Sequence, residues 1–192
     1  MSFEWSIKDV TGDIEIYRFG IFYRLTSCRY ASGRSSKDLD HGLDEFLPTT
    51  VSDAEFGTAI RRCHDATRFV DFDILPKGEA AKAAIREWKK KLVLWKRKAL
   101  ERTGCKNLEE LYKDARKSSS RRTKDVYAFF NSSLDKPTVF FEIPRHFPDY
   151  RKFIVEQPAS HEMLGKTART ALDAGVRNAR PPPERVMYFV RD

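Results

Sequence analysis

The chain has 192 residues, of which 41% are hydrophobic and 12% aromatic, so it can bury a core of its own and is not intrinsically disordered. Its three cysteines, Cys28, Cys63 and Cys105, are far apart, which argues against a disulfide framework and a zinc site. The net charge is +8, the first residues are too charged for a signal peptide, and no stretch is apolar enough for a membrane span, so we predict a soluble, cytoplasmic protein.

The first third of the chain predicts strands followed by a helix. Residues 4–30 are rich in Ile, Tyr, Phe and Thr, with a turn signal at Thr11 and Gly12, and predict strands. The polar residues 31–48 predict a hairpin or loop that leads into a helix over residues 52–68. Residues 68–76 predict a short strand or an extended connector that ends at Pro76.

The middle of the chain predicts helices. A long helix is expected over residues 79–103 and ends at Gly104. Its apolar residues recur at steps of three and four and form one stripe: Ala81, Ile85, Trp88, Leu92, Trp95 and Ala99. A shorter helix follows Asn107, which stands at capping-box spacing from Glu110. The sequence KSSSRRTK, residues 117–124, predicts a flexible basic link.

The last third of the chain repeats the order of the first. Residues 125–133, 138–144 and 151–157 predict three strands, and a second capped helix starts after Ser160. Three prolines at 181–183 end all helical structure, and residues 185–190 predict a last strand.

The two capped helices share a sequence pattern. Residues 51–68 align with residues 159–176 at a constant offset of 108, with these identities: Ser52 with Ser160, Gly57 with Gly165, Arg61 with Arg169, Asp65 with Asp173 and Ala66 with Ala174. Each serine predicts an N-cap, and Glu55 completes a capping box in the first copy only. Because a glycine within a helix costs about 1 kcal/mol relative to alanine, the repeated glycine predicts close approach of another backbone. We interpret the repeated Arg and Asp as an i,i+4 ion pair within each helix.

These patterns predict an α+β fold in one domain over residues 1–192. It would consist of two similar strand-then-helix halves, about 1–76 and 125–192, packed together. A helical connector over 77–124, with a long basic amphipathic helix, would link the halves.

Residues that could carry catalysis are not arranged for it. The four histidines, His41, His64, His146 and His161, are scattered, and no spacing meets the demands of an acid–base pair. No glycine-rich phosphate loop, HExxH, GxSxG or EF-hand pattern occurs. We therefore predict a protein that is not an enzyme, with no catalytic residues, no cofactor and no metal.

The charged segments suggest two kinds of binding partner. Residues 77–124 contain 17 Lys and Arg against 6 Asp and Glu, and a polyanion such as nucleic acid would be attracted to them, with Lys89, Lys90, Lys96 and Arg97 as candidate contacts. Solvated helix faces are often rich in lysine as well, and no nucleic-acid-binding motif occurs. Acidic residues, which could instead bind a basic partner protein, are Asp38, Asp40, Asp44, Glu45, Asp71 and Asp73. Turns and solvated strand faces also favour such residues.

Several stretches resemble the bacterial contact-dependent growth inhibition immunity proteins called CdiI. The residues LPTTVSDAEFGTAIRRCHDATR (47–68) are similar to a family stretch that runs from LP through SD and a glycine into a helix. The stretches LEELYKDARKSS, TVFFEIPRH and VEQPASHEMLGKTARTALDAG resemble the later portion of the family. The resemblance covers about residues 27–177, and its motifs are short and are largely folding signals.

The resemblance implies a binding protein without catalysis of its own. Such a protein captures the toxic C-terminal domain of its cognate CdiA effector, often a nuclease or ribonuclease, in a one-to-one complex and blocks its active site or substrate groove. The acidic residues named above would then contact the toxin. The net charge of +11 on residues 77–124 departs from the acidic, substrate-like surface expected of a nuclease inhibitor. The alternative is a nucleic-acid-binding protein that uses this basic segment.

Overall fold

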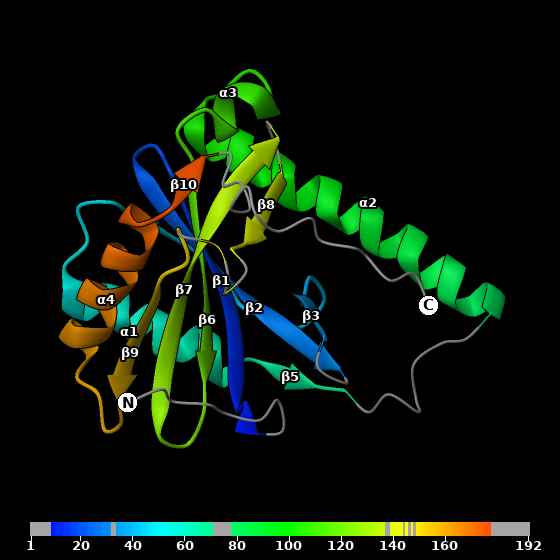
Figure 1. The fold of residues 1–192 in the computed structure, drawn as a ribbon. Helices are drawn as coiled ribbons and strands as arrows, with labels where there is room; N and C mark the ends of the chain where they lie inside the picture. Colours follow the sequence, from blue (N-terminus) through cyan, green and yellow to red (C-terminus); the bar gives the residue numbers. More distant parts are fainter. Residues whose placement is uncertain are drawn as a thin grey trace.

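A computed structural model of the protein describes residues 9–31, 34–70, 78–136, 139–143, 145, 147 and 149–177. These residues form an α+β fold with one large, mostly antiparallel sheet and four helices (Figure 1). Three predictions fall wholly or partly outside the described residues: residues 4–8 of the strands predicted over 4–30, the strand predicted over 185–190, and most of the connector predicted over 68–76.

The centre of the sheet is an antiparallel pair, β1 (Gly12–Phe19) and β6 (Arg116–Arg122). β2 (Phe22–Ala31) lies beside β1, and β7 (Val126–Lys136) lies beside β6. Shorter strands pair with these two: β3 (Arg34–Lys37), β4 (Asp44–Pro48) and β5 (Arg68–Phe69) with β2, and β8 (Val139–Glu142), β9 (Lys152–Glu156) and β10 (Val176–Arg177) with β7. Among the strands that the structure describes, only β5 and β10 pair in parallel.

The pairing registers recur along the chain. Ile14 of β1 faces Ser27 of β2, and Ser118 of β6 faces Asn131 of β7. Each residue of the second pair thus lies 104 positions after its counterpart in the first pair. The pairing of β4 with β2 recurs in the pairing of β9 with β7, in which Val126 faces Glu156 as Phe22 faces Pro48. The same hydrogen-bonded arrangement therefore occurs on both sides of the central pair.

The serine-rich stretch predicted as a flexible link is instead the central strand β6, so that prediction was wrong. The stretch lies beneath the helices, and Ser118 and Ser120 are fully buried. Their hydroxyls have partners, because Ser118 donates to the carbonyl of Phe130 at 3.0 Å and Ser120 lies 3.0 Å from the ring of His64. A small hydroxyl side chain can occupy a buried strand when its hydrogen bonds are satisfied.

Two helices, α1 (Asp53–Asp65) and α4 (His161–Asp173), pack side by side on one face of the sheet (Figure 1). Their capping serines accept from the first-turn amides of Glu55 and Met163, and the capping box with Glu55 is formed, as predicted. The core beneath them includes Ile14, Ile16, Tyr23, Leu25, Phe56, Ile60, Tyr127, Phe129, Leu164 and Leu172.

The repeated glycines lie where the two helices touch. A Cβ atom on Gly57 would be 1.7 Å from the carbonyl oxygen of His161, and one on Gly165 would be 2.0 Å from that of Asp53. Each glycine thus faces the first turn of the other helix. The predicted close approach of another backbone is confirmed, and any side chain at these positions would push the helices apart.

The predicted i,i+4 ion pairs do not form. Asp65 pairs with Arg122 at 2.5 Å, and Asp173 pairs with Arg18 at 2.7 Å, so both carboxylates reach the central strands. Arg169 pairs with Asp53 of the other helix at 2.7 Å. Asp65, Asp173 and Arg169 each pair with an opposite charge on another element instead of with the residue four positions away in the same helix.

The other face of the sheet carries α2 (Gly78–Thr103) and α3 (Leu108–Tyr112). Trp95 and Ala99 are the buried residues of α2, and they pack with Tyr17, Phe19, Phe22 and Tyr112. Gly104 has φ +70° and ends α2, as predicted. The predicted apolar stripe is buried only in part, because α2 extends beyond the sheet and leaves Ile85 54% exposed (Figure 1).

Candidate functional site

Four of the six acidic residues predicted to bind a partner lie together on one segment, residues 38–45. Two are in the connection between β3 and β4, and two begin β4. Each carboxylate forms an ion pair within the chain: Asp38 with Arg68, Asp40 with Lys91, Asp44 with Arg24 and Glu45 with Arg62. The other two predicted residues, Asp71 and Asp73, lie outside the described residues. Most of the negative charge of this segment is therefore compensated internally.

These carboxylates differ in their accessibility. The side chain of Asp38 is only 2% exposed, and its Oδ1 atom accepts from the backbone amides of Asp40 and His41. The side chain of Asp40 is 36% exposed, the largest value of the four. A partner could reach Asp40 without rearrangement, whereas Asp38 is a turn residue that holds its own backbone.

Arg24 fastens this acidic segment to α2. The guanidinium is completely buried, donates to both carboxylate oxygens of Asp44 at 2.7 and 2.6 Å, and donates to the backbone carbonyl of Trp95 at 2.5 Å. It also stacks 3.7 Å from the ring centre of Trp95 and 4.4 Å from that of Phe46. A buried charge is tolerated when it is paired and hydrogen-bonded in this way. Asp44 is thus engaged in holding α2 in place.

The basic residues predicted as polyanion contacts divide into two pairs on α2. Lys90 lies 3.4 Å from Glu87, and Arg97 lies 4.0 Å from Glu101. Lys89 and Lys96 form no ion pair with any described residue. Within the predicted quartet, Lys89 and Lys96 are therefore the two cations that no described carboxylate compensates.

A hollow of about 240 Å³ lies between the acidic segment and α2. Asp38 and Asp44 line one side, and Lys91, Trp95 and Lys98 line the other. Leu94, which is 55% exposed, adds an apolar wall. The structure thus brings together the two charged segments that the sequence predicted separately, at a hollow large enough for one side chain of a partner.

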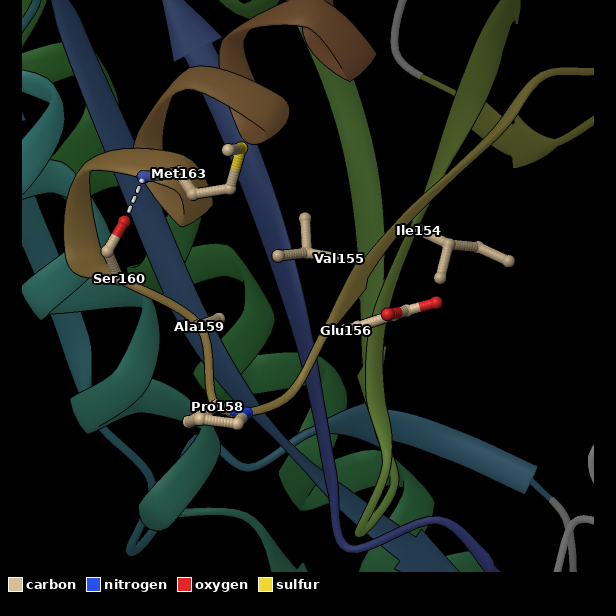
Figure 2. A pocket seen from close by; sticks show the side chains of 7 residues that line it. All are labelled: Ile154, Val155, Glu156, Pro158, Ala159, Ser160 and Met163. Atoms are coloured by element: carbon tan, nitrogen blue, oxygen red, sulfur yellow. Dashed lines mark hydrogen bonds between the residues drawn. The ribbon is translucent and has the colours of Figure 1, made fainter.

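A second hollow, of about 330 Å³, lies between β9 and the start of α4 (Figure 2). Its lining is largely apolar, and Figure 2 shows the side chains of Val155 and Met163 directed toward each other across it. Ser160 also lines the hollow, but its hydroxyl accepts from the amide of Met163 at 3.1 Å and serves as the cap of α4. The hollow therefore offers apolar contact and no activated nucleophile.

A row of charged side chains on the α2 face of the central strands was missed in the sequence. Glu15 of β1 pairs with Lys117 of β6 at 2.6 Å and with Lys37 of β3, and accepts from the hydroxyl of Tyr17 at 2.7 Å. Alternation places these residues on the same face, and the signal was lost because β6 was not recognised as a strand. Burial alone would raise the pKa of Glu15, but the two ammonium groups outweigh it and hold that pKa below its usual range.

Asp13 ends this row in a less favourable position. One of its carboxylate oxygens is buried without a hydrogen-bond partner, and the nearest cation, the Arg121 guanidinium, is 3.7 Å away. Arg121 has a closer partner in Glu142, at 3.0 Å. Burial raises the pKa of Asp13 to about 7, against the opposing effect of Arg121.

The family model for CDI immunity proteins matches residues 13–175. This chain belongs to the CDI immunity protein family. The match spans both charged segments, both hollows and the pair of capped helices. No curated protein matches the sequence.

Two solved structures have the fold of this CDI immunity protein. A protein of unknown function from Neisseria meningitidis has a TM-score of 0.74 and 15% identity, with 91% of this chain and 99% of that chain covered. A chain of the CdiA-CT/CdiI toxin and immunity complex from Yersinia pseudotuberculosis has a TM-score of 0.67 and 16% identity, with coverages of 87% and 99%. At these identities the likeness is one of fold.

Two histidines of this CDI immunity protein, His64 and His161, contact hydroxyl groups of other residues. His64 of α1 and Ser120 of β6 lie 3.0 Å apart, as in a nucleophile and base pair, but both are buried where the helix packs on the sheet. Burial, assisted by the nearby Arg122, lowers the pKa of His64 to about 3, so the ring is a poor base at neutral pH. His161 lies 3.1 Å from the hydroxyl of Thr58, and His146 is outside the described residues.

The described residues contain neither a cluster of metal ligands nor a helix able to cross a membrane. No group of three or more His, Cys, Asp or Glu side chains there could hold a metal ion. No helix in this part of the chain combines the length and the hydropathy that crossing a membrane requires.

Proposed function

We propose that this chain is the antidote to the C-terminal toxin domain of a cognate CdiA effector and neutralises it by binding in a one-to-one complex. The observation that carries the proposal is the match to the CDI immunity family over residues 13–175. The likeness to a chain of a CdiA-CT/CdiI complex supports a toxin partner. The antidote acts in the cytoplasm, where the toxin would meet its substrate.

The toxin that we propose as the partner is a nuclease, most specifically a ribonuclease, the class implied by the family resemblance. Neutralisation is steric: the immunity protein covers the active site or substrate groove of the toxin and performs no reaction itself. The buried, capping or paired state of Ser120, Ser160 and His64 supports a role without catalysis. Among the four described acidic residues predicted as toxin contacts, Asp40 is the most accessible and is the one that we propose to contact the toxin.

We also propose that the chain consists of two similar halves joined by α2 and α3. The recurring registers of the strands and the reciprocal contacts of Gly57 and Gly165 support this division. In such an arrangement the two halves form one rigid body, and the connector is the element that the repeat does not duplicate. Its buried residues Trp95, Ala99 and Tyr112 pack on the second face of the sheet, so only its exposed side can vary without disturbing the core.

Co-expression tests the proposed function. Cells that express the toxin domain encoded immediately upstream should survive when this protein is also made, and the two proteins should co-purify in equal amounts. Survival without co-purification would indicate protection by another route. A toxin that kills equally well in the presence of this protein would disprove the proposal.

The second candidate function is nucleic-acid binding through α2, which carries nine Lys and Arg against three Asp and Glu. Five of these cations are without ion-pair partners among the described residues: Arg86, Lys89, Lys96, Lys98 and Arg102. A salt titration separates the two functions, because binding to nucleic acid releases counterions and is strongest at low salt. No binding to generic RNA or DNA at about 50 mM salt would remove this candidate.

A further inference from the structure

The exposed part of α2 has an unusual composition for a helix that faces solvent. Of the large hydrophobic residues that are exposed in the described chain, three lie on this helix: Ile85 at 54%, Val93 at 65% and Leu94 at 55%. A single exposed aliphatic residue needs no explanation, but several together with cations are typical of a surface that binds a partner.

Two of these aliphatic residues share a face with the unpaired lysines. Ile85, Lys89, Val93 and Lys96 follow one another at steps of four, four and three residues, which places them along one side of a helix. We call these four residues the α2 strip. The strip covers 12 residues and is therefore about 17 Å long.

Four other cations of α2 are paired with carboxylates, whereas Arg86, Lys98 and Arg102, like the lysines of the strip, form no ion pair with a described residue. Lys90 is paired with Glu87 and Arg97 with Glu101, both within the helix. Lys91, on another side, is paired with Asp40 of the acidic segment. What marks the α2 strip is therefore the combination of two lysines without an ion pair, Lys89 and Lys96, with the exposed side chains of Ile85 and Val93.

We infer that the α2 strip is a contact surface for the toxin and that it fits an acidic patch with an apolar centre. The inference rests on the proposed function and adds the surface and the chemistry of the partner to it. Ile85 and Val93 would pack against apolar side chains of the toxin, and the two ammonium groups would each meet a carboxylate at the edge of the contact. The fixed position of α2, held by Arg24 and Trp95, presents the strip without prior ordering.

A toxin fits the α2 strip better than a nucleic acid does. Nucleic acids are bound by cations that follow the phosphates, together with aromatic side chains on which bases stack. The strip alternates cations with aliphatic side chains and contains no aromatic residue. Aliphatic side chains gain from burial against an apolar surface, which a phosphate backbone does not provide.

The test compares charge reversals on two sides of the same helix. The variant Lys89→Glu/Lys96→Glu reverses the strip, and the control Lys90→Glu/Arg97→Glu makes the same change in net charge on the compensated side. A third variant, Ile85→Asn/Val93→Asn, removes the apolar part of the strip. Affinity of each full-length protein for an inactivated form of the toxin domain encoded upstream is measured by calorimetry, and circular dichroism verifies that helix content is unchanged. A 20-nucleotide single-stranded RNA serves as a second probe.

The strip reversal should weaken toxin binding by at least tenfold, the control reversal by less than threefold, and the apolar variant by at least tenfold. Equal losses of affinity for both reversals would indicate that only the net charge of α2 affects toxin binding, and would overturn the inference. Undiminished toxin binding by the strip variants would overturn it as well. A strip reversal that abolishes RNA binding while toxin binding is unchanged would overturn it in favour of nucleic acid. Failure of the unaltered protein to bind the toxin would instead disprove the proposed function.

Discussion

Arg61 and Arg169 make the same contact in opposite directions between the two capped helices. Arg61 of α1 donates to the carbonyl of Ala159, just before α4, at 2.7 Å, and Arg169 of α4 donates to the carbonyl of Val51, just before α1. The two donors, Arg61 and Arg169, are 108 positions apart, and so are the two acceptors, Val51 and Ala159. The repeated arginines therefore bind the preceding loop of the opposite helix.

The two contacts differ at one position, where Arg169 has an acidic partner and Arg61 has none, and a substitution can supply the missing partner. Arg169 also pairs with Asp53, but the residue at the corresponding place beside Arg61 is His161, and the Nε of Arg61 is buried without a hydrogen-bond partner. We expect His161→Asp to stabilise the protein by about 1 kcal/mol, because the carboxylate would pair with Arg61 and lie in the first turn of α4.

Urea unfolding of a double-mutant cycle checks this prediction. Arg61→Ala should destabilise the His161→Asp protein more than it destabilises the unaltered protein, since it would remove the new ion pair as well. The variant His161→Asn controls for loss of the contact between the ring and Thr58. Equal costs of Arg61→Ala in both backgrounds would contradict the expected pair.

Alanine at either repeated glycine should be severely destabilising. The new Cβ of Gly57→Ala would lie 1.7 Å from a backbone oxygen, and that of Gly165→Ala 2.0 Å from another, so neither clash can be relieved by turning a side chain. We expect each change to lower the free energy of unfolding by at least about 3 kcal/mol. The control is Gly78→Ala, which meets nothing within 4 Å and should cost only about 1 kcal/mol for its positive φ.

The glycines illustrate what the sequence could predict and what it could not. The caps, the close approach at the glycines and the end of α2 at Gly104 follow from local signals, so they were predictable. The partners of Arg61, Asp65, Arg169 and Asp173 depend on residues more than 50 positions away, and a pattern within one helix could not identify them. The i,i+4 interpretation assumed that the closest partner in sequence is the closest in space.

The candidate site was predictable to a smaller extent. The charged segments were recognised from composition, but the compensation of Asp38, Asp40 and Asp44 was not, because their partners lie on β5, α2 and β2. The serines of β6 look like a flexible link, since serine is common in loops. They form a central strand because their hydroxyls find buried partners in the folded chain.

Removal of the buried Arg24 guanidinium should destabilise the protein strongly. Arg24→Met removes the cation paired with Asp44, which keeps only the weaker donor Thr26 at 3.3 Å, and removes the side-chain donor to the carbonyl of Trp95, so we expect a loss of about 3–5 kcal/mol in urea unfolding. The double variant Arg24→Met/Asp44→Asn should recover part of this loss because no buried charge is left unpaired. The exposed pair of Arg62 and Glu45 is the control, and Arg62→Ala should cost less than about 1 kcal/mol. Similar costs at the two sites would refute the role assigned to Arg24.

The buried ring of His64 predicts a loss of stability in mild acid. It lies against Ser120, Gly12 and the ring of Tyr127, and burial lowers its pKa from 6.5 to about 3, with a further contribution from Arg122. The unfolded chain therefore takes up a proton at a higher pH than the folded one. The stability due to the neutral ring is complete above pH 6.5 and is lost as the pH falls toward 3.

The expected loss from His64 between pH 7 and pH 5 is about 2 kcal/mol. Asp13 acts in the opposite direction, because its raised pKa of about 7 makes the folded state the better proton acceptor and favours folding as the pH falls toward its ordinary value. The contribution of His64 is therefore isolated by comparing urea unfolding of the unaltered protein with that of His64→Gln at both pH values. The difference in stability between the two proteins should shift by about 2 kcal/mol in favour of the variant at pH 5, whereas a constant difference would show that the ring is protonated alike in both states.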